Sequence, residues 1–192
     1  LYICVYAYIL DFEVLATSTC TQNSIGILAI SKCNSGFEPD DDLRNARERE
    51  VLFTSGATEA NNLALKGVAD WVKTGHMITA RTEHKAVLDV CKTLEDRGFR
   101  ITYLEVDRAG RIDLDALDQA ITGDTVLVSL MRDNNEVGTL HPLAEIGALC
   151  KARGVLFHCD GVQAVGKVEI DVESMGIDLL SLSGHKLYAL CM

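Results

Sequence analysis

The sequence predicts an α/β fold of three layers, in which helices cover both faces of a mostly parallel β-sheet. From Val51 onward, apolar runs of strand length alternate with segments whose apolar residues have helical spacing. This alternation is typical of parallel sheets that are buried on both faces. Short polar motifs follow several of the strands, at the edge where ligands collect in such sheets.

The predicted elements follow one another without an internal repeat. The strands are expected at residues 51–54, 76–79, 101–106, 125–131, 155–158 and 179–182, and the helices at 59–73, 85–97, 114–121 and 142–153. Asp113 is expected to cap the third helix, and Pro142 suits the first turn of the fourth. We therefore expect one domain built from strand–helix units.

Length and composition bound the class of protein. The 192 residues suit one domain or slightly more, and a hydrophobic content of 48% is enough to bury a core. A formal net charge of -10 argues against a nucleic-acid or anionic-membrane surface. The apolar stretch at residues 1–10 is too short to span a bilayer.

Residues 1–50 form an atypical N-terminal segment that we leave unassigned, whereas residues 51–192 form the domain. A strand-like stretch at 25–30 is interrupted by Ser and Gly, and the chain begins with Leu1, as a fragment would. The aspartates at 40–42 suit the start of a short exposed helix at 43–50, because negative charge stabilises a helix N-terminus.

Seven cysteines are scattered along the chain and none forms a CxxC pair. An odd number of scattered cysteines favours reduced thiols in an intracellular compartment. No grouping of residues indicates a metal site.

The most informative stretch is Ser181-Leu182-Ser183-Gly184-His185-Lys186, which follows an apolar run. Its hydroxyls and imidazole suit a phosphate, and an amine such as that of Lys186 can form a Schiff base with a carbonyl cofactor, most commonly pyridoxal 5′-phosphate (PLP). The alternative is an ordinary surface lysine after a turn.

Ser55-Gly56-Ala57-Thr58 is a small-residue turn between a strand and a helix. That arrangement directs free backbone N–H groups at an anion, and Thr58 adds a hydroxyl. An ordinary capped turn explains the same stretch equally well.

The loop after the strand at 155–158 carries Asp160 and Gln163. Asp160 suits a protonated pyridine nitrogen and Gln163 a phenolic oxygen, although an Asp that caps a turn remains the alternative. Residues 161–167 also satisfy GxxxxGK, but Val168 stands where a P-loop needs Ser or Thr, so we do not expect nucleotide binding there.

Two further loops carry candidate residues. In Thr82-Glu83-His84, a neutral imidazole can stack on an aromatic cofactor and move protons, although most lone histidines are structural. In Asn134-Asn135-Glu136-Val137-Gly138, an amide can hold a carboxylate, although a polar turn ending in Gly has the same composition.

Together the motifs SGATE, TEH, NNEVG, HxDxxQ and SGHK, which occur in this order from Val51 to about Tyr188, resemble the cysteine desulfurases of the class V aminotransferase group. The resemblance implies the large domain of a type I PLP-dependent transferase, here incomplete. It also implies release of sulfur from L-cysteine, which gives alanine and supplies sulfur for iron–sulfur cluster assembly.

The resemblance also implies roles for individual residues. Lys186 would be the Schiff-base lysine, and His84 would stack on the ring and move protons. Asp160 would pair with the pyridine nitrogen and Gln163 with the phenolic oxygen, while Asn135 would help to seat the substrate carboxylate. The phosphate would be held by Ala57, Thr58, Ser183 and His185.

The chain departs from the family at both ends. It lacks the family's usual opening turn, and it stops at Met192, before the sulfur-accepting cysteine of the family. We therefore assign no catalytic cysteine, and we leave open whether this chain is active by itself. The family implies a homodimer, a sulfur-acceptor or scaffold protein as partner, and a cytoplasmic or mitochondrial location. Selenocysteine lyase, another class V enzyme, or a non-catalytic interaction module remain alternatives.

Overall fold

The computed structural model of the chain describes residues 27–31, 51–133, 138–164 and 170–183. Within them, seven strands form one sheet in the order β2-β1-β7-β6-β5-β3-β4, and every neighbouring pair is parallel. The strands are β1 (Ile27–Ser31), β2 (Val51–Thr54), β3 (His76–Ala80), β4 (Arg100–Leu104), β5 (Thr125–Met131), β6 (Leu156–Asp160) and β7 (Leu179–Ser183). The helices are α3 (Ala57–Val72), α4 (Lys85–Asp96), α5 (Leu114–Ala120) and α6 (Leu143–Arg153).

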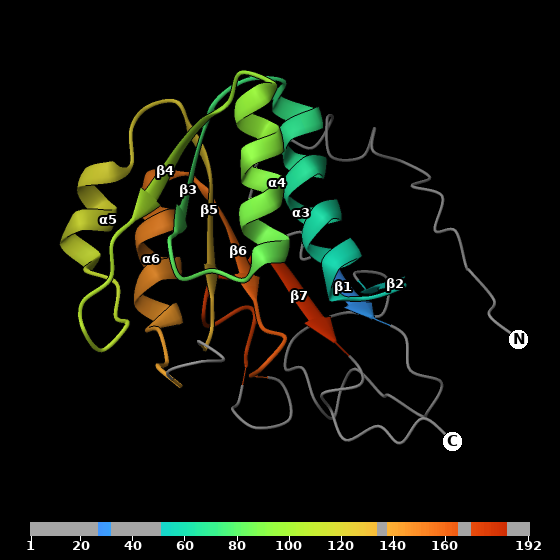
Figure 1. The fold of residues 1–192 in the computed structure, drawn as a ribbon. Helices are drawn as coiled ribbons and strands as arrows, with labels where there is room; N and C mark the ends of the chain where they lie inside the picture. Colours follow the sequence, from blue (N-terminus) through green and yellow to red (C-terminus); the bar gives the residue numbers. More distant parts are fainter. Residues whose placement is uncertain (1–26, 32–50, 134–137, 165–169, 184–192) are drawn as a thin grey trace, which may run out of the picture.

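Helices cover both faces of this sheet (Figure 1). Alternate strand residues face opposite sides: Leu127 of β5 joins the apolar cluster under α3 and α4, while its neighbour Val128 joins the cluster under α5 and α6. Both clusters consist mainly of fully buried aliphatic side chains. The predicted three-layer α/β/α class with a parallel sheet is therefore confirmed.

The strands and helices predicted from Val51 onward are all present, with ends shifted by at most two residues. The strands at 51–54 and 125–131 match β2 and β5, whereas the first predicted helix begins two residues earlier, at Ala57. Asp113 caps α5 by accepting a hydrogen bond from the backbone N–H of Asp115. Trp71 of α3 is 48% exposed.

The strand β1 comes from the segment 1–50 that the sequence left unassigned. It pairs with β7 along its whole length on one side and with β2 on the other. These five residues therefore join the sheet that residues 51–192 build. The predicted helix at 43–50 lies outside the described residues.

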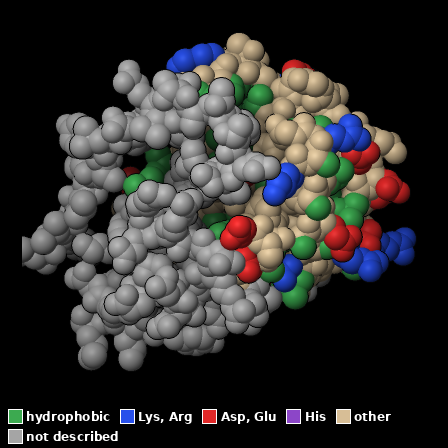
Figure 2. Space-filling model, turned by 180° about the vertical axis from the view of Figure 1, so that it is seen from behind, with side chains coloured by type: hydrophobic (Ala, Val, Ile, Leu, Met, Phe, Trp, Pro, Cys, Tyr) green, Lys and Arg blue, Asp and Glu red, His purple; other side chains and the backbone are tan. Residues whose placement is uncertain are grey.

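The surface carries charges of both signs. On the face seen in Figure 2, Lys and Arg side chains are interspersed with Asp and Glu and do not form a continuous basic patch. Within the described ranges, no helix combines the length and the apolar character needed to cross a bilayer. In the same part of the chain, no cluster of His, Cys, Asp or Glu side chains is arranged to hold a metal ion.

Candidate active site

A cavity of about 250 Å³ lies at the carboxyl ends of β3, β5 and β6, beside the start of α3. Its wall combines residues of the α3 first turn with two aspartates, two amides and an imidazole. The lining residues are Ala57, Thr58, Asn61, His84, Ala86, Met131, Asp133, Asp160, Val162 and Gln163. The structure thus brings together predicted site residues from three separate motifs.

Other predicted site residues are not seen in this cavity wall. Ser183 is buried and is the last residue of β7, one strand away from β6. Asn135, His185 and Lys186 lie outside the described residues. Their predicted roles stay predictions.

The first turn of α3 supplies backbone donors to the cavity. The first intrahelical bond runs from the N–H of Ala60 to the carbonyl of Gly56, and Gly56 has no side chain to cap the N–H groups before it. The Glu59 carboxylate instead accepts from the backbone N–H of Ser55 at 2.5 Å, which fixes the turn. Because Ala57 and Thr58 line the cavity, this helix end suits an anionic group such as a phosphate.

Asp160 lies at the end of β6 and is 7% exposed. Its Oδ2 accepts from the Asn61 amide at 2.8 Å, and its Oδ1 accepts from the backbone N–H of Val162 at 3.1 Å. Burial raises the pKa of this carboxyl, and these two donors and the nearby His84 only partly offset the shift. A cationic ligand placed against Asp160 would therefore find a carboxylate that lacks a full counter-charge.

His84 occupies the N-cap of α4, where its Nδ1 accepts from the backbone N–H of Ala86 at 3.1 Å. The ring is exposed on the cavity side of the loop between β3 and α4. The cap fixes the ring at the start of the helix. His84 and Asp160 thus line the same cavity.

Glu83, which precedes His84, is 5% exposed, and its role was not predicted. One oxygen accepts from the backbone N–H of Met131 at 2.7 Å, and no atom of the described residues partners the other. Burial, together with the nearby Asp160, holds the pKa of this carboxyl well above its usual range. It ties the loop that carries His84 to the end of β5.

Asn61 is the second residue that sequence reasoning missed. It is 1% exposed, on the sheet-facing side of α3 among Ala64 and Leu65. A polar residue on an otherwise apolar helix stripe was the available signal, because such a residue needs a partner. Its partner is Asp160.

His158 belongs to the HxDxxQ motif but lies deeper in the sheet than Asp160. Its ring bridges the hydroxyls of Ser129 at 2.8 Å and Ser181 at 2.9 Å, so it links β6 to both neighbouring strands. Burial lowers the pKa of this imidazole to about 3. His158 is therefore a neutral structural group beneath the site.

Gly161, the first glycine of the GxxxxGK match, has a role in packing. A Cβ at this position would lie 2.9 Å from Leu180 Cδ1 and 3.1 Å from Leu182 Cδ2, so a glycine lets the turn approach β7. This packing role agrees with the expectation that the stretch is not a nucleotide loop. Lys167 lies outside the described residues.

The cysteines in the described ranges are structural. Burial raises the pKa of Cys91 and Cys150 to about 12, and it holds that of Cys159 still further above its usual range. A thiol in that state supplies no thiolate nucleophile at neutral pH. Cys4, Cys20, Cys33 and Cys191 lie outside the described residues.

Comparison with known proteins gives consistent matches. The family described as Aminotransferase class-V matches residues 16–190. The mitosomal cysteine desulfurase of Trachipleistophora hominis is 57% identical over 151 residues, which are 77% of this chain and 34% of that protein. The cysteine desulfurase IscS of Ehrlichia chaffeensis is 52% identical over 169 residues, which are 87% of this chain and 41% of that protein.

Solved structures agree. SspA in complex with cysteine superposes with a TM-score of 0.68 at 44% identity, over 69% of this chain and 39% of that one. A NifS-like protein gives a TM-score of 0.66 at 40% identity, over 69% of this chain and 37% of that one. The chain thus spans about two-fifths or less of the length of these relatives.

Proposed function

Because this chain belongs to the class V aminotransferase family, we propose that its cavity binds PLP and that it acts in the release of sulfur from L-cysteine. The family match confirms the resemblance that the sequence motifs indicated. The proposal extends the activity named for the relatives to the part of the protein that this chain represents.

The observation that carries the proposal is the environment of Asp160. This buried carboxyl faces a cavity, and burial is the main cause of its raised pKa. A protonated ring nitrogen is the counter-charge that such an acid needs, and the free N–H groups at the start of α3 suit a phosphate at the other end of the same ligand. The residues present therefore fit PLP.

Each predicted residue then has a task in the proposal. When bound, PLP supplies an electron sink for negative charge that develops on the substrate. Asp160 holds the ring nitrogen, Gln163 donates to the phenolic oxygen, and His84 stacks on the ring. The proposed phosphate ligands are Ala57, Thr58, Ser183 and His185. The two remaining assignments are Asn135 for the substrate carboxylate and Lys186 for the amine that anchors the cofactor.

The substrate and partners are inferred from the relatives. One similar structure is described as a complex with cysteine, which supports L-cysteine as substrate. We propose a homodimer that passes sulfur to an acceptor or scaffold protein for iron–sulfur cluster assembly. Light scattering of the purified chain tests the dimer by measuring its molar mass. A mass equal to that of one chain at all concentrations would contradict the dimer.

We also propose that residues 51–192, with β1 added from the segment 1–50, make up the PLP-binding part. An intracellular location, cytoplasmic or mitochondrial, is consistent with the scattered cysteines and with the mitosomal relative. Fluorescent tagging of the native protein tests the compartment.

The decisive experiment is a PLP titration of the chain, followed by absorbance. Binding should produce a visible band, and borohydride reduction followed by peptide mapping should find the label on Lys186. No band, or label spread over surface lysines, would instead favour a non-catalytic interaction module. Alanine release from cysteine compared with selenocysteine then separates a desulfurase from a selenocysteine lyase.

Asp160→Asn is the informative variant, and Asp178→Asn is its matched control. Both aspartates have a pKa raised by burial and both accept a backbone N–H, but Asp178 lies at the amino end of β7 and is not part of the cavity wall. Asp160→Asn should weaken PLP binding by about 100-fold, since a charge-assisted hydrogen bond is lost. Equal weakening by both variants would contradict the proposed site.

A further inference from the structure

The cap on α4 determines where the proton of His84 resides. The backbone N–H of Ala86 points at Nδ1 of His84, with the two nitrogens 3.1 Å apart. A backbone N–H can only donate, so Nδ1 must present its lone pair. A neutral imidazole has one ring proton, which therefore sits on Nε2.

The loop that carries His84 is held at two points in this state. His84 has the extended backbone of an N-cap residue, with φ −60° and ψ 148°. On its other side, Glu83 is anchored to the backbone N–H of Met131. Because the cap engages Nδ1 and His84 lines the cavity, Nε2 is the ring nitrogen left for a ligand.

We propose that His84 faces its ligand as a hydrogen-bond donor through Nε2–H, and that it exchanges a proton with the ligand only after its cap on α4 opens. This inference rests on the function proposed above for the same cavity. The ligand atom opposite Nε2 is then an acceptor, such as the sulfur of a cysteine thiolate or an anionic oxygen. A neutral thiol finds no acceptor on this ring.

The proton balance explains the requirement for opening. Loss of the Nε2 proton from the capped ring would leave an imidazolate anion. In the open state, the hydrogen bond from Ala86 is broken, and Nδ1 takes a proton from a hydronium ion of the solvent, which leaves water. The Nε2 proton can then pass to the ligand, which leaves a neutral ring with its proton on Nδ1. The cap re-forms when the two positions exchange protons with water.

Two substitutions separate the functions of the two nitrogens. In His84→Asn, a short amide keeps an acceptor near the position of Nδ1, and Asn is a favoured N-cap residue. In His84→Gln, a longer amide places a donor toward the position of Nε2 but serves the cap poorly. The two variants have the same chemical group and differ by one methylene.

The test uses nitrogen-15 NMR of the histidine rings in the full chain without cofactor. The His84 signals are assigned by their absence from both variants. We expect a pyridine-like Nδ1 and a pyrrole-like Nε2 at neutral pH. A proton on Nδ1, or shifts that average the two tautomers, would overturn the proposal.

A second measurement uses urea unfolding of the same proteins. The midpoint should stay near the wild-type value in His84→Asn and fall in His84→Gln. Equal midpoints in the two variants would contradict the capping argument. Since neither measurement uses PLP, failure of cofactor binding would count against the proposed function and leave the tautomer assignment standing.

Discussion

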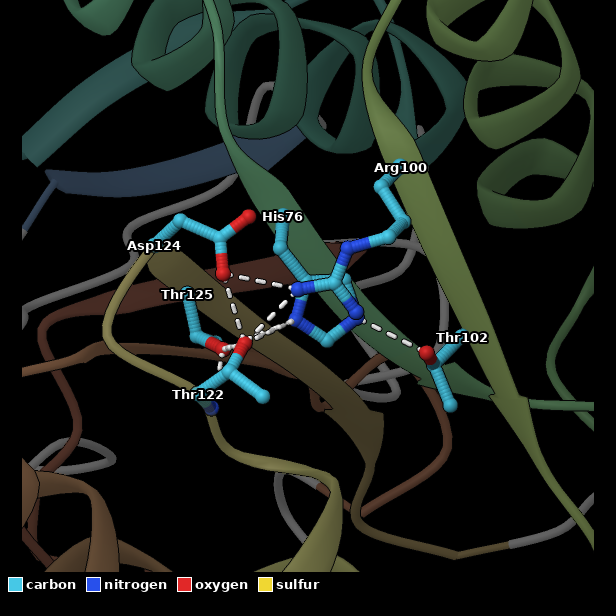
Figure 3. A network of polar contacts seen from close by, with 6 residues as sticks. All are labelled: His76, Arg100, Thr102, Thr122, Asp124 and Thr125. Atoms are coloured by element: carbon cyan, nitrogen blue, oxygen red, sulfur yellow. Dashed lines mark hydrogen bonds and ion pairs between the residues drawn. The ribbon is translucent and has the colours of Figure 1, made fainter.

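The two ends of one sheet carry two polar clusters that differ in how completely their hydrogen bonds are made. At the amino ends of the strands, both ring nitrogens of His76 make hydrogen bonds, Nδ1 with Thr125 and Nε2 with Thr102, each at 2.8 Å (Figure 3). Arg100 binds Asp124 and Thr122 beside them. Within the described residues, none of these six side chains has a buried polar atom without a partner.

At the carboxyl ends of the strands, hydrogen bonding of the buried polar groups is less complete. There the Asn61 carbonyl oxygen and one Glu83 oxygen are buried, and no described residue partners them. Burial also raises the pKa of Glu83 and Asp160. Buried polar groups are normally satisfied, and exceptions cluster where a protein binds or reacts. We interpret the amino-end cluster as a structural network that stabilises the sheet and the carboxyl-end cluster as a functional site.

The largest effect is expected from a substitution that tests the structural role of the amino-end cluster. His76→Ala leaves the hydroxyls of Thr102 and Thr125 without their buried partner and opens a cavity, so the free energy of unfolding should fall by about 3 kcal/mol. Urea unfolding measures the change. PLP affinity of the variant that remains folded should match wild type, because His76 lies at the opposite end of β3 from the cavity. A loss of affinity without a loss of stability would reverse our interpretation of the two ends.

The second prediction concerns pH, where the two clusters have opposite signs. The folded-state pKa of Glu83 is raised, so its contribution to stability is complete below the unfolded pKa and is lost as pH rises toward the folded value. The pKa of His76 is lowered by burial and by Arg100, so its contribution is present above the unfolded pKa and is lost as pH falls.

Glu83→Gln isolates the carboxyl-end share of this pH dependence. Gln keeps the acceptor for Met131 and cannot ionise, so wild type should lose stability relative to the variant as pH rises from 5 to 8. Unfolding free energies at both pH values give the difference. The Asp178→Asn control should leave the contribution of Glu83 in place, and parallel wild-type and Glu83→Gln profiles would show that Glu83 is ionised in the fold.

The third prediction tests the support of Asp160. Asn61→Leu removes the amide that donates to its Oδ2, so PLP affinity should fall by about 10-fold, or about 1.4 kcal/mol, while the stability of the cofactor-free chain changes by less than about 1 kcal/mol. Asn62→Leu is the matched control, because the adjacent Asn62 bonds only the Thr58 carbonyl and is not part of the cavity wall. Similar PLP affinities for the two variants would remove Asn61 from the site.

The sequence predicted the layers well because the strands of a covered parallel sheet are continuous apolar runs. The run at β5 was placed without error, since Thr125–Met131 is too apolar and too β-branched for a loop. The strand-like stretch at 25–30 overlaps β1 but was left unassigned, because it is short and its partner β7 lies about 150 residues further along the chain. Local sequence contains no record of such a pairing.

The site was predictable only where a sequence motif makes the chemistry of a residue visible. Asp160 and His84 carry chemistry that a motif makes visible, and the structure places both in one cavity wall. Asn61 and Glu83 act through other groups, so their roles depend on contacts made by the fold. His158 shares a motif with Asp160, yet it lies two residues, or about 7 Å, further from the strand end and is not part of the cavity wall.

The smallest effect is expected at the rim of the amino-end cluster, where Arg100 meets Asp124. The two side chains are 49% and 58% exposed, so water and salt screen the pair. Arg100→Met keeps the aliphatic stem and removes the charge, and should lower the free energy of unfolding by about 0.5 kcal/mol at low salt and by less at high salt. Urea unfolding at two salt concentrations measures this. The contribution of the buried His76 hydrogen bonds should not depend on salt. A large, salt-dependent loss of unfolding free energy in Arg100→Met would show that the ion pair, and not the imidazole, stabilises this end of the sheet.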